Sequence, residues 1–353
     1  MEQRLNEIVR SIAPLDERAM ELARSRLDRL TKPPGSLGRL EEVAVQVAGI
    51  MGDPRPKISR KVVFVLAADH GVVAEGVSPY PQVVTAQMVA NFVRGGAAIN
   101  VLARRAGADV VVADLGVAAR EYLPAAGFLA QPVRPGTRNF VREDAMSRAE
   151  ALQAIFAGYE LASRTVTPRT SLIGLGEMGI GNTTASSAIV AALLGCDAGE
   201  VVGPGTGLDA DGVRRKAEVV ERSLRSRAPD PEDPLDVLAK VGGFEIAGLV
   251  GVALAAAERR LPILVDGFIS GAAALVAARL APALQQYLIA SHCSAEPGHR
   301  AVLRALGLRP LLDLSLRLGE GTGAALAMPL VEAAVAILDE MATFEEAGVS
   351  DRG

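Results

Sequence analysis

Short apolar runs recur along the middle of the chain, and each is followed by a turn that contains glycine. They are KVVFVLAA (61–68), DVVVAD (109–114), SLIGLGE (171–177), PILVDG (262–267) and YLIASH (287–292). An Ala-rich stretch with helical periodicity comes after each turn. Because strands buried on both faces of a parallel sheet are apolar throughout, this pattern predicts parallel strands alternating with helices. A buried helix segment would also fit some of the runs, but their length and the glycines favour strands.

The two ends of the chain have a helical pattern instead. Residues 1–51 are expected to be helical: Leu, Ile and Ala recur at helical spacing in Leu5–Leu30, and the break TKPPGSLG (31–38) divides two predicted helices. Ala324–Met341 is typical of one long Ala/Leu helix. We therefore expect an α/β fold in which an open, mostly parallel sheet is flanked by helices, as in Rossmann-like proteins. The large domain, residues 60–325, is expected to contain the candidate active site. A small helical domain would be built from residues 1–59 and 326–353.

Composition and charge limit the kinds of partner and compartment that fit the protein. Half of the 353 residues are hydrophobic but only 3% are aromatic, and the net charge is −4 with both signs mixed along the chain. These values argue against nucleic acid as a partner. Cys196 and Cys293 form neither a disulfide framework nor a metal-type spacing, which fits a reducing compartment. The charged N-terminus lacks a signal-peptide segment, and the longest apolar stretches, identified as Gly248–Ala257 and Phe268–Ala278, are shorter than the roughly 18–20 residues of a membrane span. We expect a cytoplasmic protein that is not embedded in a membrane.

Glycine-rich segments follow two of the predicted elements. In an open parallel sheet, ligands bind beyond the carboxyl ends of the strands. GLGEMGIGNTTASSAI (174–189) combines glycines with Asn182 and Thr183, which could cap the next helix, and it fits a phosphate site and an ordinary strand–turn–helix equally well. GPGTGLD (203–209), followed by Lys216, offers N–H donors and a positive charge, but alone it also fits a turn before a solvated basic helix. Together the two segments favour a phosphate site.

The segment ADHGVVAEGVSPYPQVVTAQM (68–88) places polar groups among Val, Pro and Met. Ser78, Tyr80 and Gln87 in this setting would suit a flat, largely apolar heterocycle, although a plain surface loop has the same composition. His70 comes at a strand end, where a structural hydrogen bond is a commoner role than general base catalysis.

A single carboxylate stands out near the C-terminal end. In LRLGEGTGAALAMP (316–329), Glu320 lies between two glycines just before an apolar helix. Desolvation there would raise its pKa and make it a better proton acceptor, while the helix dipole opposes that shift. The same position would let it simply stabilise the helix N-terminus.

The remaining histidines lie in SHCSAEPGH (291–299), beside Cys293 and Glu296. A metal site or a Cys–His nucleophile is conceivable there. No paired ligand spacing accompanies the histidines, however, so we expect no bound metal.

Taken in order, these and other segments resemble one enzyme family over nearly the whole chain. They are TKPPGSLGRLE (31–41), ADHGV with SPYPQVVT (68–85), NFVRGGAAINVLAR (91–104), GTRNF (136–140), GEMGIGNTT (176–184), GPGTGLD (203–209), LVDGFISGAAA (264–274), SHCSAEPGH (291–299), LGEGTGAALAMPL (318–330) and DEMATFEEAGVS (339–350). The series closely resembles the nicotinate-nucleotide–dimethylbenzimidazole phosphoribosyltransferases, which act in nucleotide loop assembly during cobalamin biosynthesis.

The resemblance implies that nicotinate mononucleotide donates its 5-phosphoribosyl group to 5,6-dimethylbenzimidazole, giving α-ribazole 5′-phosphate and nicotinate with inversion at C1′. It places the general base at Glu320. Together with the glycine-rich segments it assigns the phosphoribosyl group to Glu177, Gly179, Gly181, Asn182, Thr183, Gly205, Thr206 and Lys216. It assigns the acceptor base to Ser78, Tyr80, Gln87, Met88 and Leu318. It further implies a homodimer that needs no cofactor.

Two other functions fit the sequence less well. One is a non-catalytic nucleotide or riboside sensor on the same fold, which would bind the donor without releasing nicotinate. The other is a hydrolase that uses Asp69 and His70, or His292, Cys293 and Glu296. The sequence also leaves the acceptor open among benzimidazoles, purines and phenols.

Overall fold

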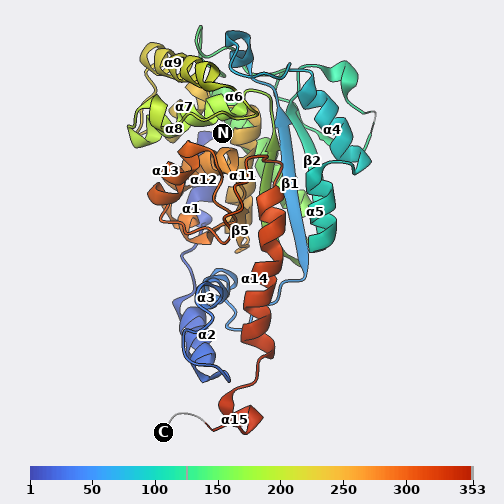
Figure 1. Ribbon diagram of the computed structural model, residues 1–353, viewed down its shortest axis with the longest axis vertical. Coiled ribbons are helices and arrows are strands. Elements are labelled where there is room, and N and C mark those ends of the chain that lie inside the picture. The colour runs from blue at the N-terminus through green and yellow to red at the C-terminus, as the bar shows by residue number, and fades with distance from the viewer. Residues whose placement is uncertain (125, 351–353) are drawn as a thin grey trace.

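A sheet of six parallel strands runs through the centre of the protein, in the order β3–β2–β1–β4–β5–β6 (Figure 1). The structure is a computed structural model that describes residues 1–124 and 126–350. The strands are β1 (Arg60–Ala68), β2 (Ala108–Gly116), β3 (Leu129–Ala130), β4 (Thr170–Met178), β5 (Ile263–Val265) and β6 (Leu288–Ala290). This order is that of Rossmann sheets, in which the direction of strand addition reverses between β1 and β4. The predicted fold class and the five predicted strands are confirmed; only the two-residue edge strand β3 was not predicted.

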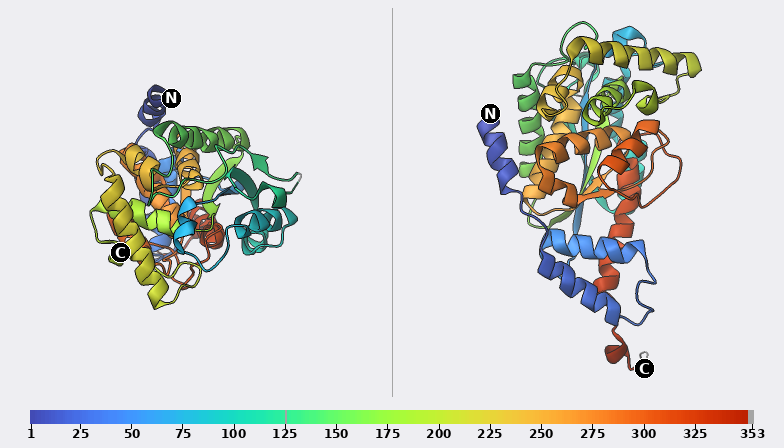
Figure 2. Two further views of the ribbon diagram at one scale, coloured as in Figure 1. Left: turned by 90° about the horizontal axis from the view of Figure 1, so that it is seen from above. Right: turned by 90° about the vertical axis from the view of Figure 1, so that its left-hand side faces the viewer.

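Strand β1 explains why helices cover both faces of the sheet (Figure 2). Val62 and Phe64 belong to one hydrophobic core, and Val63 and Val65 belong to the other, and all four are fully buried. Because successive side chains of a strand point to opposite faces, an apolar run of this kind needs a helical layer on each side.

The helices of the first core are α1 (Glu2–Ser11), α6 (Arg148–Thr165), α7 (Asn182–Leu194), α8 (Ala198–Val201), α9 (Ala210–Arg227), α10 (Pro234–Val241), α11 (Phe244–Glu258), α12 (Phe268–Leu280) and α13 (Pro297–Ala305). Those of the second are α2 (Glu17–Arg29), α3 (Arg39–Met51), α4 (Val84–Arg94), α5 (Ala98–Ala106) and α14 (Thr322–Glu340). The short α15 (Phe344–Ala347) and the 3-10 turns η1 (Gly71–Glu75), η2 (Arg120–Tyr122) and η3 (Pro282–Tyr287) complete the described elements.

Helix α14 is the described helix whose length and apolar composition would suit a membrane span. Glu332 interrupts the apolar run of α14, so the helix was not among the longest uninterrupted apolar stretches of the sequence, and Pro329 lies within it without ending it. About half of the helix is buried inside the protein, where it packs against α3, α5 and β4. Such burial is typical of a core helix.

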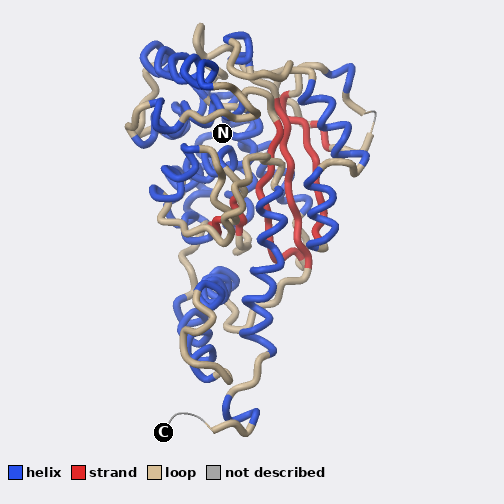
Figure 3. The backbone as a smooth tube through the Cα atoms, viewed as in Figure 1, coloured by secondary structure: helices blue, strands red, loops and turns tan. Residues whose placement is uncertain are grey.

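The N-terminal region forms three helices rather than two, because the chain leaves helical conformation between α1 and α2, around Pro14. Helix α1 contacts α11, whereas α2, α3 and the C-terminal half of α14 lie together beyond the amino ends of the strands (Figures 1 and 3). Apolar side chains of α3, such as Val47, share a core with Val63 of the sheet. The division into two domains stays a prediction, and its last residues, 351–353, lie outside the described residues.

Candidate active site

A pocket lies at the carboxyl ends of β4 and β5, next to the point where the strand order reverses. Its walls come from five segments of the chain, and the residues that line it are Glu177, Met178, Gly179, Ile180, Asn182, Thr183, Gly205, Thr206, Gly267, Phe268, Ile269, His292, Ser294, Glu296, Arg317, Leu318 and Gly319. Most of the residues predicted for the phosphoribosyl group are thus brought together. The exceptions are Gly181 and Lys216, which lie directly behind the wall.

Helix α7 begins at this pocket with Gly181, whose φ of 95° is in the left-handed region that favours glycine. No side chain caps the helix, so the capping predicted for Asn182 and Thr183 is wrong. The two side chains are used elsewhere: Asn182 donates to Glu177, and Thr183 accepts from Lys216 over 2.7 Å. The start of α7 is therefore tied to both a carboxylate and a cation.

Lys216 is fully buried beneath the glycine-rich loop 203–207. Its Nζ also donates to the Gly203 carbonyl over 3.3 Å. Burial lowers the pKa of Lys216 to about 8, and the nearby Glu296 partly offsets this shift. A buried ammonium behind a loop of small residues can attract a phosphate with little competition from water.

Three buried carboxylates lie near one another beside the pocket, namely Glu177, Asp266 and Glu320, and each is at most 5% exposed. Glu177 lines the pocket, whereas Asp266 and Glu320 lie next to the lining residues Gly267 and Gly319. Burial, with added repulsion from Asp266, Glu245 and Glu320, raises the pKa of Glu177 to about 8. Burial also raises the pKa of Asp266 to about 7, although backbone N–H groups at the start of α14 oppose the rise. No lysine or arginine of the described residues forms a salt bridge with these three groups. The cluster would favour a positively charged ligand.

Glu320 occupies a strained turn. Its φ is 64°, between Gly319 at 83° and Gly321 at 86°. The side chain is buried, which raises its pKa, and the carboxylate accepts a long hydrogen bond of 3.4 Å from Ile99 N–H in the first turn of α5. Glu320 therefore does not stabilise the N-terminus of its own helix, α14. Its backbone lies against Gly176 of β4, where a Cβ would come within 2.5 Å of the Glu320 carbonyl oxygen.

Of the residues predicted to contact the acceptor base, only some line the pocket. Leu318 lines the pocket, but Ser78, Tyr80, Gln87 and Met88 do not. These four residues lie on or just before α4, which is joined to the pocket by a 3.1 Å hydrogen bond from Ile180 N–H to Thr85 Oγ1. Tyr80 and Leu318 are each about half exposed, at 49% and 57%. The acceptor side is thus open, in contrast to the closed side that holds Lys216.

The three histidines are all buried in the structure. His70 Nε2 lies 2.6 Å from Glu245 Oε1, and both side chains are fully buried behind the pocket, which fits a structural role. Burial lowers the pKa of His299 to about 3, so this ring is neutral at physiological pH. Among the described residues, no group of three or more His, Cys, Asp or Glu side chains is arranged to hold a metal ion.

Sequence reasoning assigned no role to two residues of this region, Asp266 and Arg317. Arg317 donates to the Gly205 carbonyl over 2.8 Å and so joins the glycine loop to the turn before Glu320. The signal for Asp266 was present, because it lies at the carboxyl end of the predicted strand run 262–267, where ligand-binding residues of parallel sheets are expected.

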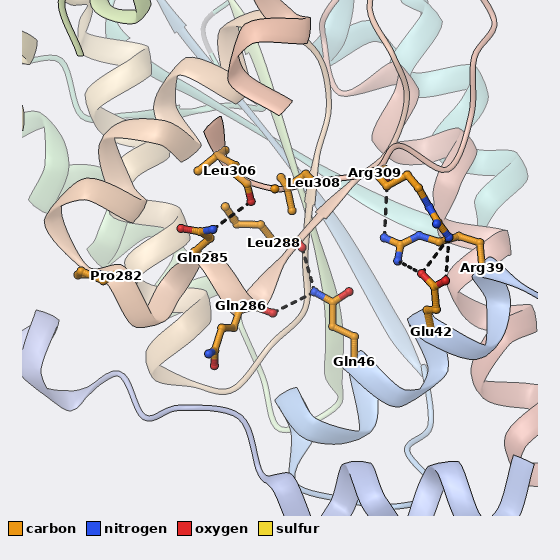
Figure 4. A pocket seen from close by; sticks show the side chains of 11 residues that line it. Arg39, Glu42, Gln46, Pro282, Gln285, Gln286, Leu288, Leu306, Leu308 and Arg309 are labelled. Carbon is orange, nitrogen blue, oxygen red and sulfur yellow. Dashed lines mark hydrogen bonds and ion pairs between the residues drawn. The ribbon is translucent and has the colours of Figure 1, made fainter. Parts of the chain in front are cut away.

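A second, more polar groove lies at the opposite edge of the sheet (Figure 4). There Arg39 and Arg309 both pair with Glu42 of α3, and Gln46 donates to the carbonyl of Leu288, the first residue of β6. This groove is at the amino ends of the strands, so the carboxylate cluster and the candidate chemistry are remote from it.

A family model described as a phosphoribosyltransferase matches residues 12–349. The chain belongs to this phosphoribosyltransferase family. It is 54% identical over 346 residues to the nicotinate-nucleotide–dimethylbenzimidazole phosphoribosyltransferase of Geobacter sp., covering 98% of this chain and 99% of that one. It is 56% identical over 344 residues to the enzyme of the same name from Chloroflexus aurantiacus, covering 98% of each. The crystal structure of CobT from Thermus thermophilus is 53% identical, with a TM-score of 0.91 over 95% of this chain and 100% of that one. The resemblance seen in the sequence is confirmed for this phosphoribosyltransferase.

Proposed function

We propose that the protein transfers the 5-phosphoribosyl group of nicotinate mononucleotide to 5,6-dimethylbenzimidazole, with release of nicotinate. The observation that carries this proposal is a pocket lined by Glu177 and the glycine-rich loop at Gly205, with the buried carboxylates of Asp266 and Glu320 beside it and Lys216 behind the loop. The donor has a cationic pyridinium ring, an incipient oxocarbenium ribose and an anionic phosphate. The site offers carboxyl groups for the pyridinium ring and the ribose, and the buried Lys216 for the phosphate.

Glu320 is the proposed general base. One benzimidazole nitrogen attacks C1′ as the bond from C1′ to the pyridinium nitrogen breaks, and the bonding pair leaves with nicotinate. The proton on the other benzimidazole nitrogen goes to Glu320, whose buried carboxylate has a raised pKa and so is a stronger proton acceptor. Attack from the face opposite the leaving group converts the β-linked donor into α-ribazole 5′-phosphate.

Glu177 and Lys216 have positioning and electrostatic roles in this mechanism. The carboxyl group of Glu177 stands at the end of β4 and accepts a hydrogen bond from Asn182. A cationic donor would lower its raised pKa and favour the ionised form, which would stabilise positive charge on the ribose. The ammonium of Lys216 and the loop at Gly205 and Thr206 would hold the phosphate. The acceptor would rest against Leu318 and the side chains of α4.

A product assay tests the proposal. The protein is incubated with nicotinate mononucleotide with and without dimethylbenzimidazole, nicotinate is measured by chromatography, and the anomeric configuration of the riboside is read by NMR. Acceptor-dependent nicotinate release with an α-linked product is expected. Donor binding without release would instead identify a sensor and overturn the proposal.

We also propose that the protein is a cytoplasmic homodimer with a small domain built from both termini. The dimer is what the family resemblance of the sequence implies. Light scattering after gel filtration is expected to give twice the 36.6 kDa mass of the chain. A monomeric mass at micromolar concentration would refute it.

A further inference from the structure

The buried carboxylate of Asp266 contacts the turn that carries Glu320. Asp266 follows β5 directly and is 1% exposed. Its Oδ2 accepts from Gly321 N–H over 3.1 Å, and its Oδ1 accepts from Ala324 N–H over 2.9 Å. Asp266 thus satisfies two backbone donors on either side of the start of α14.

Helix α14 depends on this contact from another strand, because its own N-cap residue, Gly321, supplies no side-chain hydrogen bond. A free helix N-terminus carries unsatisfied N–H groups and a partial positive charge, both of which a carboxylate stabilises. The residue just before the cap is Glu320, held at a positive φ that is unfavourable for any residue with a Cβ. The contact with Asp266 therefore stabilises the conformation in which the Glu320 carboxylate is buried.

The space around Asp266 is closed. Its Oδ1 lies 4.0 Å from His292 Nδ1. A side chain at Gly323 would collide with that His292 ring, and a Cβ there would also come within 2.9 Å of Asp266 Oδ1. The carboxylate is therefore enclosed between the start of α14 and the His292 ring.

We propose that Asp266 is a positioning residue for the reaction: it holds the Gly319–Gly321 turn so that the Glu320 carboxylate meets the N–H of the acceptor. This inference rests on the proposed role of Glu320 as base. It assigns Asp266 no contact with the reacting atoms, and it predicts that losing Asp266 impairs proton removal from the acceptor more than binding of the donor.

The test compares Asp266→Asn with Asp114→Asn as a matched control. Asp114 is also fully buried, near the carboxyl end of β2, and its Oδ1 also accepts from two backbone N–H groups, those of Gly116 and Val117. It contacts neither the pocket nor the Glu320 turn. Both variants are assayed with 5,6-dimethylbenzimidazole and with 5,6-dichlorobenzimidazole, which is close to it in shape but loses its N–H proton more readily. A better acid needs less help from the base.

For Asp266→Asn we expect kcat with dimethylbenzimidazole to fall about 10- to 100-fold, a markedly smaller fall with the dichloro acceptor, and a change of less than about threefold in the dissociation constant of nicotinate mononucleotide. Asp114→Asn is expected to lower the melting temperature with kcat near the wild-type value for both acceptors. Unchanged kcat in Asp266→Asn, or an equal loss with both acceptors, would overturn the proposal.

Two further variants distinguish a folding defect from loss of the positioning role, and loss of the positioning role from an incorrect assignment of the base. If Asp266→Asn shows no cooperative melting, Asp266→Ser keeps one oxygen for the backbone N–H groups and is judged by the same acceptor dependence. Glu320→Gln, assayed alongside, must show the acceptor-dependent loss as well. Wild-type turnover in Glu320→Gln would reject the base itself, whereas a loss there without a loss in Asp266→Asn would reject only the positioning role.

Discussion

Replacing Glu320 with Gln removes a proton acceptor while keeping nearly the same side-chain shape. The amide oxygen can still accept the weak hydrogen bond from Ile99 N–H, so the turn and the start of α5 should be retained. What is lost is a buried carboxylate that can take the acceptor's proton as the bond to C1′ forms. The variant therefore isolates proton transfer from donor binding.

The size of the effect follows from that role. Positioned general bases contribute about 10²- to 10⁴-fold in rate, which is about 2.7–5.4 kcal/mol of transition-state stabilisation at 1.36 kcal/mol per factor of ten. Folding should not suffer, because burial raises the pKa of Glu320. A carboxyl whose pKa is raised in the folded state stabilises the fold least at high pH, where it is charged. The melting temperature of the variant at pH 8 is thus expected to equal or exceed that of the wild type.

The assay measures nicotinate release at saturating donor and acceptor, with donor binding measured by calorimetry. Glu340→Gln is a suitable control, since Glu340 is exposed at the far end of the same helix. We expect the control to match the wild type and Glu320→Gln to lose turnover with its donor affinity kept within about threefold. Turnover within threefold of the wild type, or a parallel loss of donor binding, would refute the reasoning.

Other consequences are open to measurement. Lys216→Gln should raise KM for nicotinate mononucleotide about 10- to 100-fold, because a charge-assisted hydrogen bond is lost. In the wild type, KM for nicotinate mononucleotide should rise as the pH passes about 8, because Lys216 then loses its proton. Glu177→Gln should raise the melting temperature more at pH 9 than at pH 5, and an equal shift at both pH values would contradict this. Burial raises the pKa of Glu177 from 4.5 to about 8, so its stabilising contribution is fully present below pH 4.5 and is lost as the pH rises through 8. Gly319→Ala should lower kcat/KM at least tenfold, because a Cβ there collides with Glu177 Oε1. Gly307 has a similar positive φ but open space around it, so the control Gly307→Ala should lower the free energy of unfolding only by the backbone strain of about 1–2 kcal/mol.

Much of the fold was predictable because its determinants are local. Runs such as KVVFVLAA are apolar at every position, and only a strand covered on both faces buries all of them, as Val62 and Val63 do here. The glycines around Glu320 likewise marked a turn, and the structure has positive φ angles there. Where a local signal was ambiguous, at Asn182 and Thr183, the capping prediction was wrong, because Gly181 starts the helix and both side chains have distant partners.

The sequence by itself thus determined the strand–helix alternation, the glycine turns and the identity of the candidate acid–base groups. Only the tertiary structure decided which of these groups meet: Ile99 with Glu320, and Asp266 with Gly321, are pairs separated by 221 and 55 positions. Backbone preferences act over a few neighbouring residues, so they can be recognised in a short stretch of sequence. Desolvation, and with it the raised pKa values of Glu177, Asp266 and Glu320, depends on how many other segments exclude water from a carboxylate, and that is settled only when the whole chain has packed.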